Sequence, residues 1–483
     1  MLFISKRRLR ILALVLGIGL LVSLSARAVV QFQLGQEIEH YRTFFKTHKD
    51  NIHDIFDPLS IKQIPYETIN ALYESRKAEG SSRKSTIAWD NYAYVNYVTE
   101  PEYLCNTVMQ FKRLKELKTK AKLVALISRD LVESENEDKR QTAEKLIAKL
   151  SELAPEQVIV KTVDNIVKPE DSSPWKKSLT KLLVFNQTEF DRIIYLDSDA
   201  AVYSNMDELF FLPSYVTFAA PLTYWFLSDS DLEEAKAEIR AADKATVKLE
   251  NIINSVNTRV RKGQQIYNHL PVLPSSLVFH SSNVGKEILD STSSASPLFR
   301  LGSGTRRAKV RFSSNLMVIT PKTGTFDSIV QYLLPVASRQ KDQYDIDLIN
   351  NKLYNLKAII HEQFLLFRKL KSAFTPEVMV LPFREYGLLS SSIKNKMHHE
   401  LLANELLGYE GGLASSESSW KELVKKSKYI HYSDWPVSKP WLYAKFDQLE
   451  CHPETNADEE KEMCEVWNSV YRDYWDSRYI CQL

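Results

Sequence analysis

Short apolar segments alternate with helix-like segments over residues 92–196, and this alternation constrains the fold more than any other feature. Four segments are apolar and rich in β-branched or aromatic residues, as strands are: 92–99, 122–128, 157–163 and 192–196. Three segments with the length and pattern of helices lie between them: 101–117, 139–153 and 176–186. Strands this apolar, separated by helices, predict a Rossmann-like α/β domain with a mostly parallel sheet flanked by helices.

The last of these strands runs directly into Asp197 and Asp199, in the stretch "RIIYLDSDA". Residues two apart in a strand point to the same face, and sheets of this kind bind ligands beyond the carboxyl ends of their strands. Two adjacent carboxylates repel each other unless a cation compensates, and hard divalent ions prefer oxygen ligands. A lone D-x-D pattern is a weak signal. Because the sequence has no Gly-rich phosphate loop, the pair predicts a metal that bridges the protein to a diphosphate.

A mostly apolar run over 11–30 follows the cations of "SKRRLR". Its length suits a transmembrane helix, which must cross a hydrocarbon layer of about 30 Å. The positive-inside rule makes 1–10 a cytoplasmic tail and places the rest of the chain in a lumen or outside the cell. The expectation is therefore a signal-anchor and a single-pass type II membrane protein. A cleaved signal peptide is the alternative, because "SLSARA" resembles a cleavage site.

The remainder of the chain divides into a neck, one large domain and a tail. Residues 31–87 are expected to form a lumenal neck, which ends in a polar joint, "SRKAEGSSRKST". The catalytic domain is expected over 88–445, with a charged insertion at about 228–310 that is helical in its first part. The tail, 446–483, is expected to pack back on the domain.

Cysteine usage, charge and one sequon add three smaller constraints. Four cysteines in an oxidising lumen predict two disulfides with three possible pairings, and a free thiol at Cys105 is the alternative. The net charge of +2, without a nucleic-acid recognition motif, argues against a nucleic-acid partner. Asn186, in "NQT", is a possible glycosylation site.

Five stretches, in this order, resemble the blocks of glycosyltransferase family 8, the glycogenin-like group: 93–104, 178–200, 311–321, 344–350 and 430–441. The phrases "AAPLTYWFLSDSDLE" and "KGQQIYNHLP" resemble a fungal Golgi subgroup of that family, which transfers N-acetylglucosamine. The resemblance implies a GT-A fold, a divalent metal that is usually Mn²⁺, a UDP-sugar donor and retention of anomeric configuration.

The resemblance also implies roles for individual residues at the diphosphate. Asp197, Asp199 and His431 match the metal ligands of the family, and Asp197 matches a contact to the ribose as well. Lys439 matches the lysine that meets the diphosphate. A metal and a lysine placed there stabilise the charge that builds on the leaving group. The segment from His431 to Lys439 is two residues longer than in glycogenin-like relatives, which leaves the reach of Lys439 open.

Residues on the uridine and sugar side follow from the same blocks. Tyr97, Thr99 and Tyr103 match the strand and turn that hold the uridine, and the ring of Tyr103 is expected to stack on the uracil. Lys181 matches a lysine near the donor sugar. The alternative for the tyrosines is an ordinary place in the core, and for Lys181 a place on a helix surface.

The block at 311–321 supplies Ser313 and Ser314, which are expected to line the donor sugar and the acceptor. Asp345 aligns with an aspartate at the sugar, and either Asp345 or Asp347 is placed to steady positive charge on the anomeric carbon. Either aspartate is equally suited to cap the helix that follows. Because no unambiguous nucleophile emerges, a covalent intermediate and a front-face mechanism both remain open.

Together these features predict a metal-dependent, retaining transferase that moves N-acetylglucosamine from UDP-GlcNAc to mannose-terminated glycans. The expected partners are the donor, the glycan acceptor and the Golgi membrane, and an oligomer is left open. Another UDP-hexose, glucose or galactose, is the alternative donor. A non-catalytic, membrane-tethered glycan-binding protein is the rival function.

Overall fold

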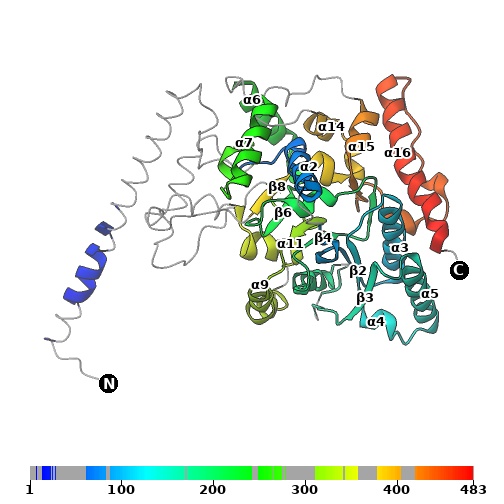
Figure 1. The fold of residues 1–483 in the computed structure, drawn as a ribbon, viewed down its shortest axis with the longest axis horizontal. Coiled ribbons are helices and arrows are strands. Elements are labelled where there is room, and N and C mark those ends of the chain that lie inside the picture. The colour runs from blue at the N-terminus through cyan, green and yellow to red at the C-terminus, as the bar shows by residue number, and fades with distance from the viewer. Residues whose placement is uncertain are drawn as a thin grey trace.

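In the computed structural model, a seven-stranded sheet of order β3-β2-β1-β4-β7-β6-β8 organises the chain (Figure 1). The structure describes residues 61–82, 87–168, 171–173, 175–241, 248–264, 266–274, 277, 310–340, 343–356, 378–403 and 419–481, with Arg7, 13–22, 24–25 and 28 near the N-terminus. The strands are β1 Tyr92–Val98, β2 Lys122–Ser128, β3 Val158–Val163, β4 Arg192–Leu196, β6 Phe218–Pro221, β7 Leu316–Ile319 and β8 Val378–Leu381.

The pairing of these strands is mostly parallel. β1, β2, β3 and β4 run parallel to their neighbours in this group, and β6 runs parallel to β8. Only β7 is antiparallel, to both β4 and β6, among the pairs of this sheet that the structure describes. The expectation of an α/β fold with a mostly parallel sheet and flanking helices is therefore confirmed.

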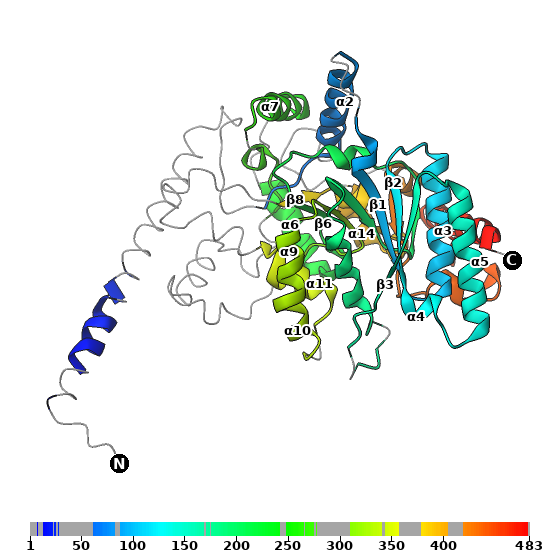
Figure 2. The ribbon, with the colours of Figure 1, turned by 60° about the horizontal axis from the view of Figure 1, so that its bottom comes forward.

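Helices cover both sides of the sheet. The α-helices of four residues or more are α2 Tyr66–Ser82, α3 Pro101–Glu116, α4 Arg129–Val132, α5 Glu137–Leu153, α6 Asp229–Ala241, α7 Leu249–Arg261, α9 Thr323–Ser328, α10 Leu334–Ala337, α11 Asp345–Leu348, α13 Phe383–Tyr386, α14 Lys396–Ala403, α15 Trp420–Lys426 and α16 Asp458–Ser477. Figure 2 shows α3 and α5 together on one side of β1, β2 and β3. Pro101 begins α3, and the side chain of Asn136 caps α5 by accepting from the amide of Lys139.

Shorter helical turns join these elements. The 3₁₀ turns are η2 Trp89–Asn91, η3 Ser178–Asn186, η4 Asp207–Phe211, η5 Tyr224–Phe226, η6 Tyr267–His269, η11 Ser390–Lys394, η12 Pro440–Leu442, η13 Phe446–Gln448 and η14 Arg478–Cys481, and the π turns are η8 Ile329–Leu333 and η9 Ile349–Leu353. The α-helix expected over 176–186 is thus a 3₁₀ segment. It is buried around most of its circumference, so tertiary contacts rather than an amphipathic stripe determine its winding.

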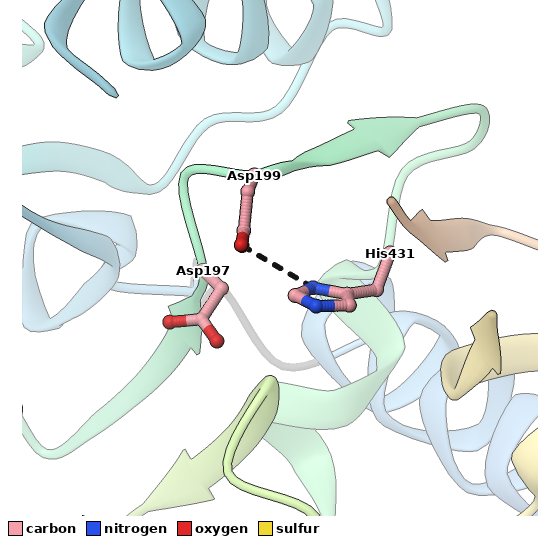
Figure 3. Close-up of side chains that lie close together, drawn as sticks. All are labelled: Asp197, Asp199 and His431. Atoms are coloured by element: carbon pink, nitrogen blue, oxygen red, sulfur yellow. Dashed lines mark ion pairs between the residues drawn. The ribbon is translucent and has the colours of Figure 1, made fainter. Parts of the chain in front are cut away.

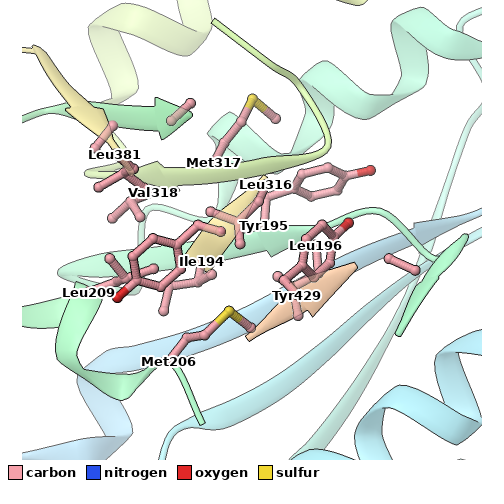
Figure 4. Packing of buried hydrophobic residues seen from close by; sticks show 14 of the residues in the cluster. Ile194, Tyr195, Leu196, Met206, Leu209, Leu316, Met317, Val318, Leu381 and Tyr429 are labelled. Atoms are coloured by element: carbon pink, nitrogen blue, oxygen red, sulfur yellow. The ribbon is translucent and has the colours of Figure 1, made fainter. Parts of the chain in front are cut away.

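A second, three-stranded sheet has the order β5-β10-β9, with β5 Ala200–Val202, β9 Leu388–Leu389 and β10 Tyr429–His431. β10 runs antiparallel to β5, with His431 opposite Ala200. This register brings the end of β10 beside the turn that follows β4. Tyr429 also joins the core around β4 and β7, which Figure 4 shows as interlocked side chains of Ile194, Tyr195, Leu196, Leu316, Met317 and Val318.

The folded unit begins earlier than residue 88. Four apolar residues upstream are buried in the same core: Ile61, Ile64, Ile69 and Leu72. Single bridges pair Lys62 with Val272 and Gln63 with Val380. Residues 61–82 therefore pack on the domain rather than forming part of a separate neck, and "SRKAEGSS" of the expected joint lies in α2.

Both expected disulfides are present. Cys105 in α3 pairs with Cys481 at the end of the tail, and Cys451 pairs with Cys464 in α16. A free thiol at Cys105 is therefore wrong. The buried face of α16 carries Trp467, Tyr471 and Tyr474, so the tail packs on the domain through both aromatic and covalent contacts.

Parts of two predicted segments lie outside the described residues. Among the described residues, no helix is both long enough and apolar enough to cross a membrane. Of the expected span 11–30, only 13–22, 24–25 and 28 are described, and they are helical. Of the expected insertion, α6 and α7 are helical as predicted, and 278–309 lie outside the described residues.

Replacing Gly387 with Ala is expected to destabilise the fold by about 1–3 kcal/mol, because close-packed interiors tolerate added methyl groups poorly. A Cβ at Gly387 would lie 2.8 Å from Cβ and 2.9 Å from Cγ of Pro221. The midpoint of thermal unfolding measures the effect. Gly324→Ala is the matched control, because a Cβ there meets nothing within 4 Å. Equal midpoints for both variants would contradict the prediction.

Candidate active site

Two buried amides hold the turn that carries Asp197 and Asp199. The side-chain nitrogen of Gln110 donates to the carbonyl oxygens of Asp197 at 2.8 Å and Ala200 at 2.7 Å. Asn96 donates to the side-chain oxygen of Gln110 at 2.8 Å and to the carbonyl of Leu196 at 3.0 Å. These bonds satisfy backbone groups that the end of β4 would otherwise leave buried and unpaired. Both amides escaped the sequence-based prediction, although polar residues on otherwise apolar faces are the signal that points to them.

Asp197, Asp199 and His431 converge at this turn (Figure 3). One ligand atom from each of the three residues lies within 4.8 Å of the others. His431 Nδ1 lies 3.2 Å from Asp199 Oδ1, and it is buried without a hydrogen-bond partner among the described residues. Burial lowers the pKa of His431 to about 3, against the pull of Asp199, so the imidazole is neutral at neutral pH. A neutral imidazole and two carboxylates fit a divalent ion such as Mn²⁺.

The two carboxylates differ in proton affinity. Burial raises the pKa of Asp197 to about 7, because it outweighs the opposing charge of Lys181, and the neighbouring Asp199 adds to the rise. Burial acts on Asp199 as well, but His431 and Lys439 outweigh it and hold the pKa of Asp199 at about 2. Lys439 is the partner that keeps its charge at neutral pH. Asp199 is therefore the permanent anion of the pair.

Lys439 reaches the turn despite the longer segment that precedes it. Its Nζ lies 2.8 Å from Asp199 Oδ2 and 3.4 Å from Asp434 Oδ1, and it donates to the carbonyl of Tyr432. Burial favours a neutral amine, but Asp199 and Asp434 outweigh burial and raise the pKa of Lys439. The ammonium group is thus held beside the proposed metal ligands, and a buried ammonium can form charge-assisted hydrogen bonds with an anion.

Lys181 makes a second charged centre. Its Nζ lies 3.1 Å from Asp197 Oδ1, 3.1 Å from Asp345 Oδ2 and 3.3 Å from Ser314 Oγ. Burial favours the neutral amine, but Asp197 and Asp345 outweigh burial and raise the pKa of Lys181. Lys181 is buried in η3 rather than exposed, so a helix-surface position is wrong.

The structure separates the roles of Asp345 and Asp347. Asp347 accepts from the amide of Tyr344 at 3.2 Å at the start of α11, and it pairs with Arg311 at 2.9 Å. Asp347 is therefore the N3 residue of a capping box, whose side chain accepts from the amide of the N-cap residue Tyr344. Asp345, the first residue of that helix, faces Lys181 and so belongs to the site.

The residues expected around the uridine lie at the end of β1 and the start of α3. Tyr97 lies beside Tyr195, with ring centroids 6.3 Å apart, and burial raises the pKa of its hydroxyl even though Lys181 opposes the rise. Thr99 is buried where β1 ends. Tyr103, in the first turn of α3, is half-buried and makes an edge contact with Trp441 at 5.4 Å. Their roles toward a nucleotide remain predictions.

Two predicted positions stand apart from the charged centre. The hydroxyl of Ser313 accepts from the amide of Asn315 at 3.1 Å, so it is engaged in a local turn. Asn186 is exposed at the end of η3. The structure therefore brings together Asp197, Asp199, His431, Lys439, Lys181, Asp345 and Ser314, and leaves Ser313 and Asn186 outside that cluster.

The whole chain aligns with fungal proteins named glucose N-acetyltransferase 1. It is 48% identical over 486 residues to the protein of Saccharomyces cerevisiae, which covers 99% of both chains. It is 48% identical over 488 residues to the protein of Candida glabrata, which covers 99% of this chain and 97% of that relative. The family described as "Mannosyltransferase putative" matches residues 97–269.

A solved structure of the galactosyltransferase LgtC, with donor and acceptor sugar analogs, covers 80% of this chain and 99% of its own. Its sequence identity is 10% and its TM-score is 0.35. The full-length relatives, by contrast, are similar enough to show the family. The chain belongs to the family of the fungal glucose N-acetyltransferase 1 proteins, which confirms the recognition made from the motif blocks, and it is a glycosyltransferase.

Proposed function

We propose that this glycosyltransferase has a GT-A fold and transfers N-acetylglucosamine, with retention, from UDP-GlcNAc to mannose-terminated glycans. The observation that carries the proposal is the convergence of Asp197, Asp199 and His431, with Lys439 2.8 Å from Asp199. The names of the full-length relatives support N-acetylglucosamine as the transferred group. Because the chain is a glycosyltransferase, the rival function, that of a non-catalytic glycan-binding protein, is excluded.

In this proposal the site has a diphosphate side and a sugar side. Asp197, Asp199 and His431 would hold a divalent ion, which, when bound, offsets the negative charge of the diphosphate. Lys439 binds the leaving diphosphate directly, and it stabilises the transition state more than the ground state because its partner gains charge as the bond breaks. Both sides belong to one buried cluster, so water is largely excluded and each charge acts strongly.

On the sugar side, Asp345 and Lys181 act as a pair. Asp345 is held by Lys181 and is proposed to face the anomeric carbon, where positive charge develops as the glycosidic bond to phosphate breaks. Lys181 also keeps Asp197 in place, so it links the two sides of the site. Ser314 also belongs to the sugar side, because its hydroxyl contacts Lys181.

The uridine is proposed to lie against Tyr97, Thr99 and the ring of Tyr103. We further propose that residues 11–30 anchor the chain as a type II protein of the Golgi membrane and that the domain lies in the lumen. The apolar run after the basic cluster supports this location. Acceptor glycans of the secretory pathway would then be within reach of the site.

Asp199→Ala is expected to lower turnover of UDP-GlcNAc by about a hundredfold or more, because it removes a metal ligand and the partner of Lys439. The measurement is sugar transfer by the full-length chain from UDP-GlcNAc, UDP-glucose, UDP-galactose or GDP-mannose, in Mn²⁺ or EDTA, with release of UDP (or of GDP from GDP-mannose) followed in parallel. Asp138→Ala, an exposed aspartate in α5, is the matched control. Turnover that is equal in EDTA and in Mn²⁺ would contradict metal dependence, and preference for another donor would change the sugar.

The affinity for Mn²⁺ is expected to fall by about tenfold for each pH unit below about 7, because one proton on Asp197 must leave before the ion binds. Asp199 and His431, with pKa values of about 2 and about 3, are already deprotonated in this range. Electron paramagnetic resonance of free Mn²⁺ measures the Kd. In Asp197→Asn, the affinity for Mn²⁺ should no longer change with pH in this range. A Kd of the wild-type chain that does not change between about pH 6 and about pH 8 would contradict the prediction.

Asp345→Asn is expected to lower kcat/KM by about a hundredfold, because it removes the negative charge proposed to face the anomeric carbon. Asp347→Asn is the matched control two residues away. It should cost only about 1 kcal/mol of stability through the lost ion pair with Arg311, because Asn still accepts from the amide of Tyr344, and kcat/KM should stay near the wild-type value. Steady-state kinetics and thermal unfolding separate the two effects. The reverse pattern would assign the sugar-side role to Asp347.

A further inference from the structure

The C-terminal helix α16 contacts the segment 431–441 through a cluster of aromatic rings. The ring of Tyr432 lies 5.6 Å from that of Tyr471 and 5.3 Å from that of Tyr474, measured between centroids. All three tyrosines are buried. In Figures 1 and 2, α16 lies on the same side of the sheet as α3. The helix is therefore part of the wall behind the proposed site, although none of its residues belongs to the charged cluster.

Tyr432 connects this aromatic contact to the diphosphate side. Its amide donates to the carbonyl of Asp199 at 2.9 Å, and its carbonyl accepts from Nζ of Lys439. It also follows His431 directly in the chain. A displacement of its ring would consequently move backbone groups that hold all three of these residues.

A parallel contact supports the next residue along. The amide of Ser433 donates to the hydroxyl of Ser390 at 3.0 Å, and that hydroxyl lies 3.0 Å from the hydroxyl of Tyr471. Residues 432 and 433 are thus both held from the direction of α16. Since buried, fully packed contacts of this kind are stiff, they limit how far the segment can shift.

Tyr474 also reaches the uridine side. Its ring lies 6.2 Å from that of Trp441, which in turn contacts Tyr103, the residue proposed to stack on the uracil. Its hydroxyl donates to the side-chain oxygen of Asn106 in α3 at 3.1 Å. The disulfide from Cys105 to Cys481 ties the end of the tail to the same helix. Tyr474 therefore contacts both Tyr432, on the diphosphate side, and Trp441, on the uridine side.

We propose that Tyr474 is a positioning residue for the nucleotide donor: from α16 it holds Tyr432 on the diphosphate side and Trp441 on the uridine side at a fixed separation. This inference rests on the proposed function, since it takes the cluster around Asp199 as the metal and diphosphate site. Tyr474 is not one of the residues proposed to bind the metal or the donor. It acts through the two aromatic residues that it packs against.

The test is binding rather than turnover, on the full-length chain, with Mn²⁺ measured by electron paramagnetic resonance and UDP by calorimetry. Tyr474→Leu removes the ring and keeps apolar volume, so both Kd values should rise by about tenfold, as they do when residues supporting metal ligands are lost. Tyr474→Phe keeps both ring contacts, and its Kd values should stay close to wild type. Trp475→Ala is the matched control, because Trp475 contacts Phe446 and Arg478 instead.

The outcomes separate this inference from the function on which it rests. If the wild-type chain binds neither Mn²⁺ nor UDP, the proposed function is wrong and the positioning role falls with it. If wild type binds and Tyr474→Leu binds equally well, only the positioning role is overturned. Equal weakening in Trp475→Ala would also overturn it, since the cause would be general loosening of α16. Should Tyr474→Leu not fold, Tyr474→Met is measured instead, since it also removes the ring and keeps apolar volume, with a rise in both Kd values expected and unchanged values overturning the inference.

Discussion

The structure depends on the placement of three carboxylates in one buried volume. Asp197, Asp199 and Asp345 face two ammonium groups, those of Lys181 and Lys439, beside a neutral imidazole. One negative charge is thus left without a protein cation when all three carboxylates are ionised. Burial, with a smaller contribution from the neighbouring Asp199, raises the pKa of Asp197, and a bound divalent ion would favour its ionised form. This charge balance supports the proposal that the site takes up a divalent ion.

The fold keeps these groups in place by long-range pairing. His431 lies opposite Ala200 in the second sheet, so a strand near the end of the chain places this proposed metal ligand beside a turn near the middle of the chain. Asn96 and Gln110 add hydrogen bonds to that turn from β1 and α3. Buried amides of this kind specify one backbone arrangement, because an unsatisfied carbonyl in the interior is costly. The position of the charges therefore follows from the register of two sheets and not from the loops alone.

Both ends of the described unit extend the domain beyond the segment that holds the charges. Residues 61–82 add apolar side chains to the core, and α16 adds the aromatic contacts that reach Tyr432 and Trp441. The disulfide between Cys105 and Cys481 fixes the end of the tail relative to α3. Since α3 also carries Tyr103, the tail and the residue proposed to stack on the uracil are attached to the same helix. The chain thus uses segments far from its motifs to stiffen the site.

The sequence by itself determined the alternating strands and helices, the position of Asp197 and Asp199 at a strand end, and the glycosyltransferase family. These follow from local periodicity and from motif blocks, which are properties of neighbouring residues. Only the tertiary structure decided that Asp345 faces Lys181 while Asp347 caps a helix, that 61–82 joins the core, and which cysteines pair. The reason is physical. Burial, strand register and the proximity of charges depend on which distant segments of the chain come into contact, and the local sequence around a residue does not specify those contacts.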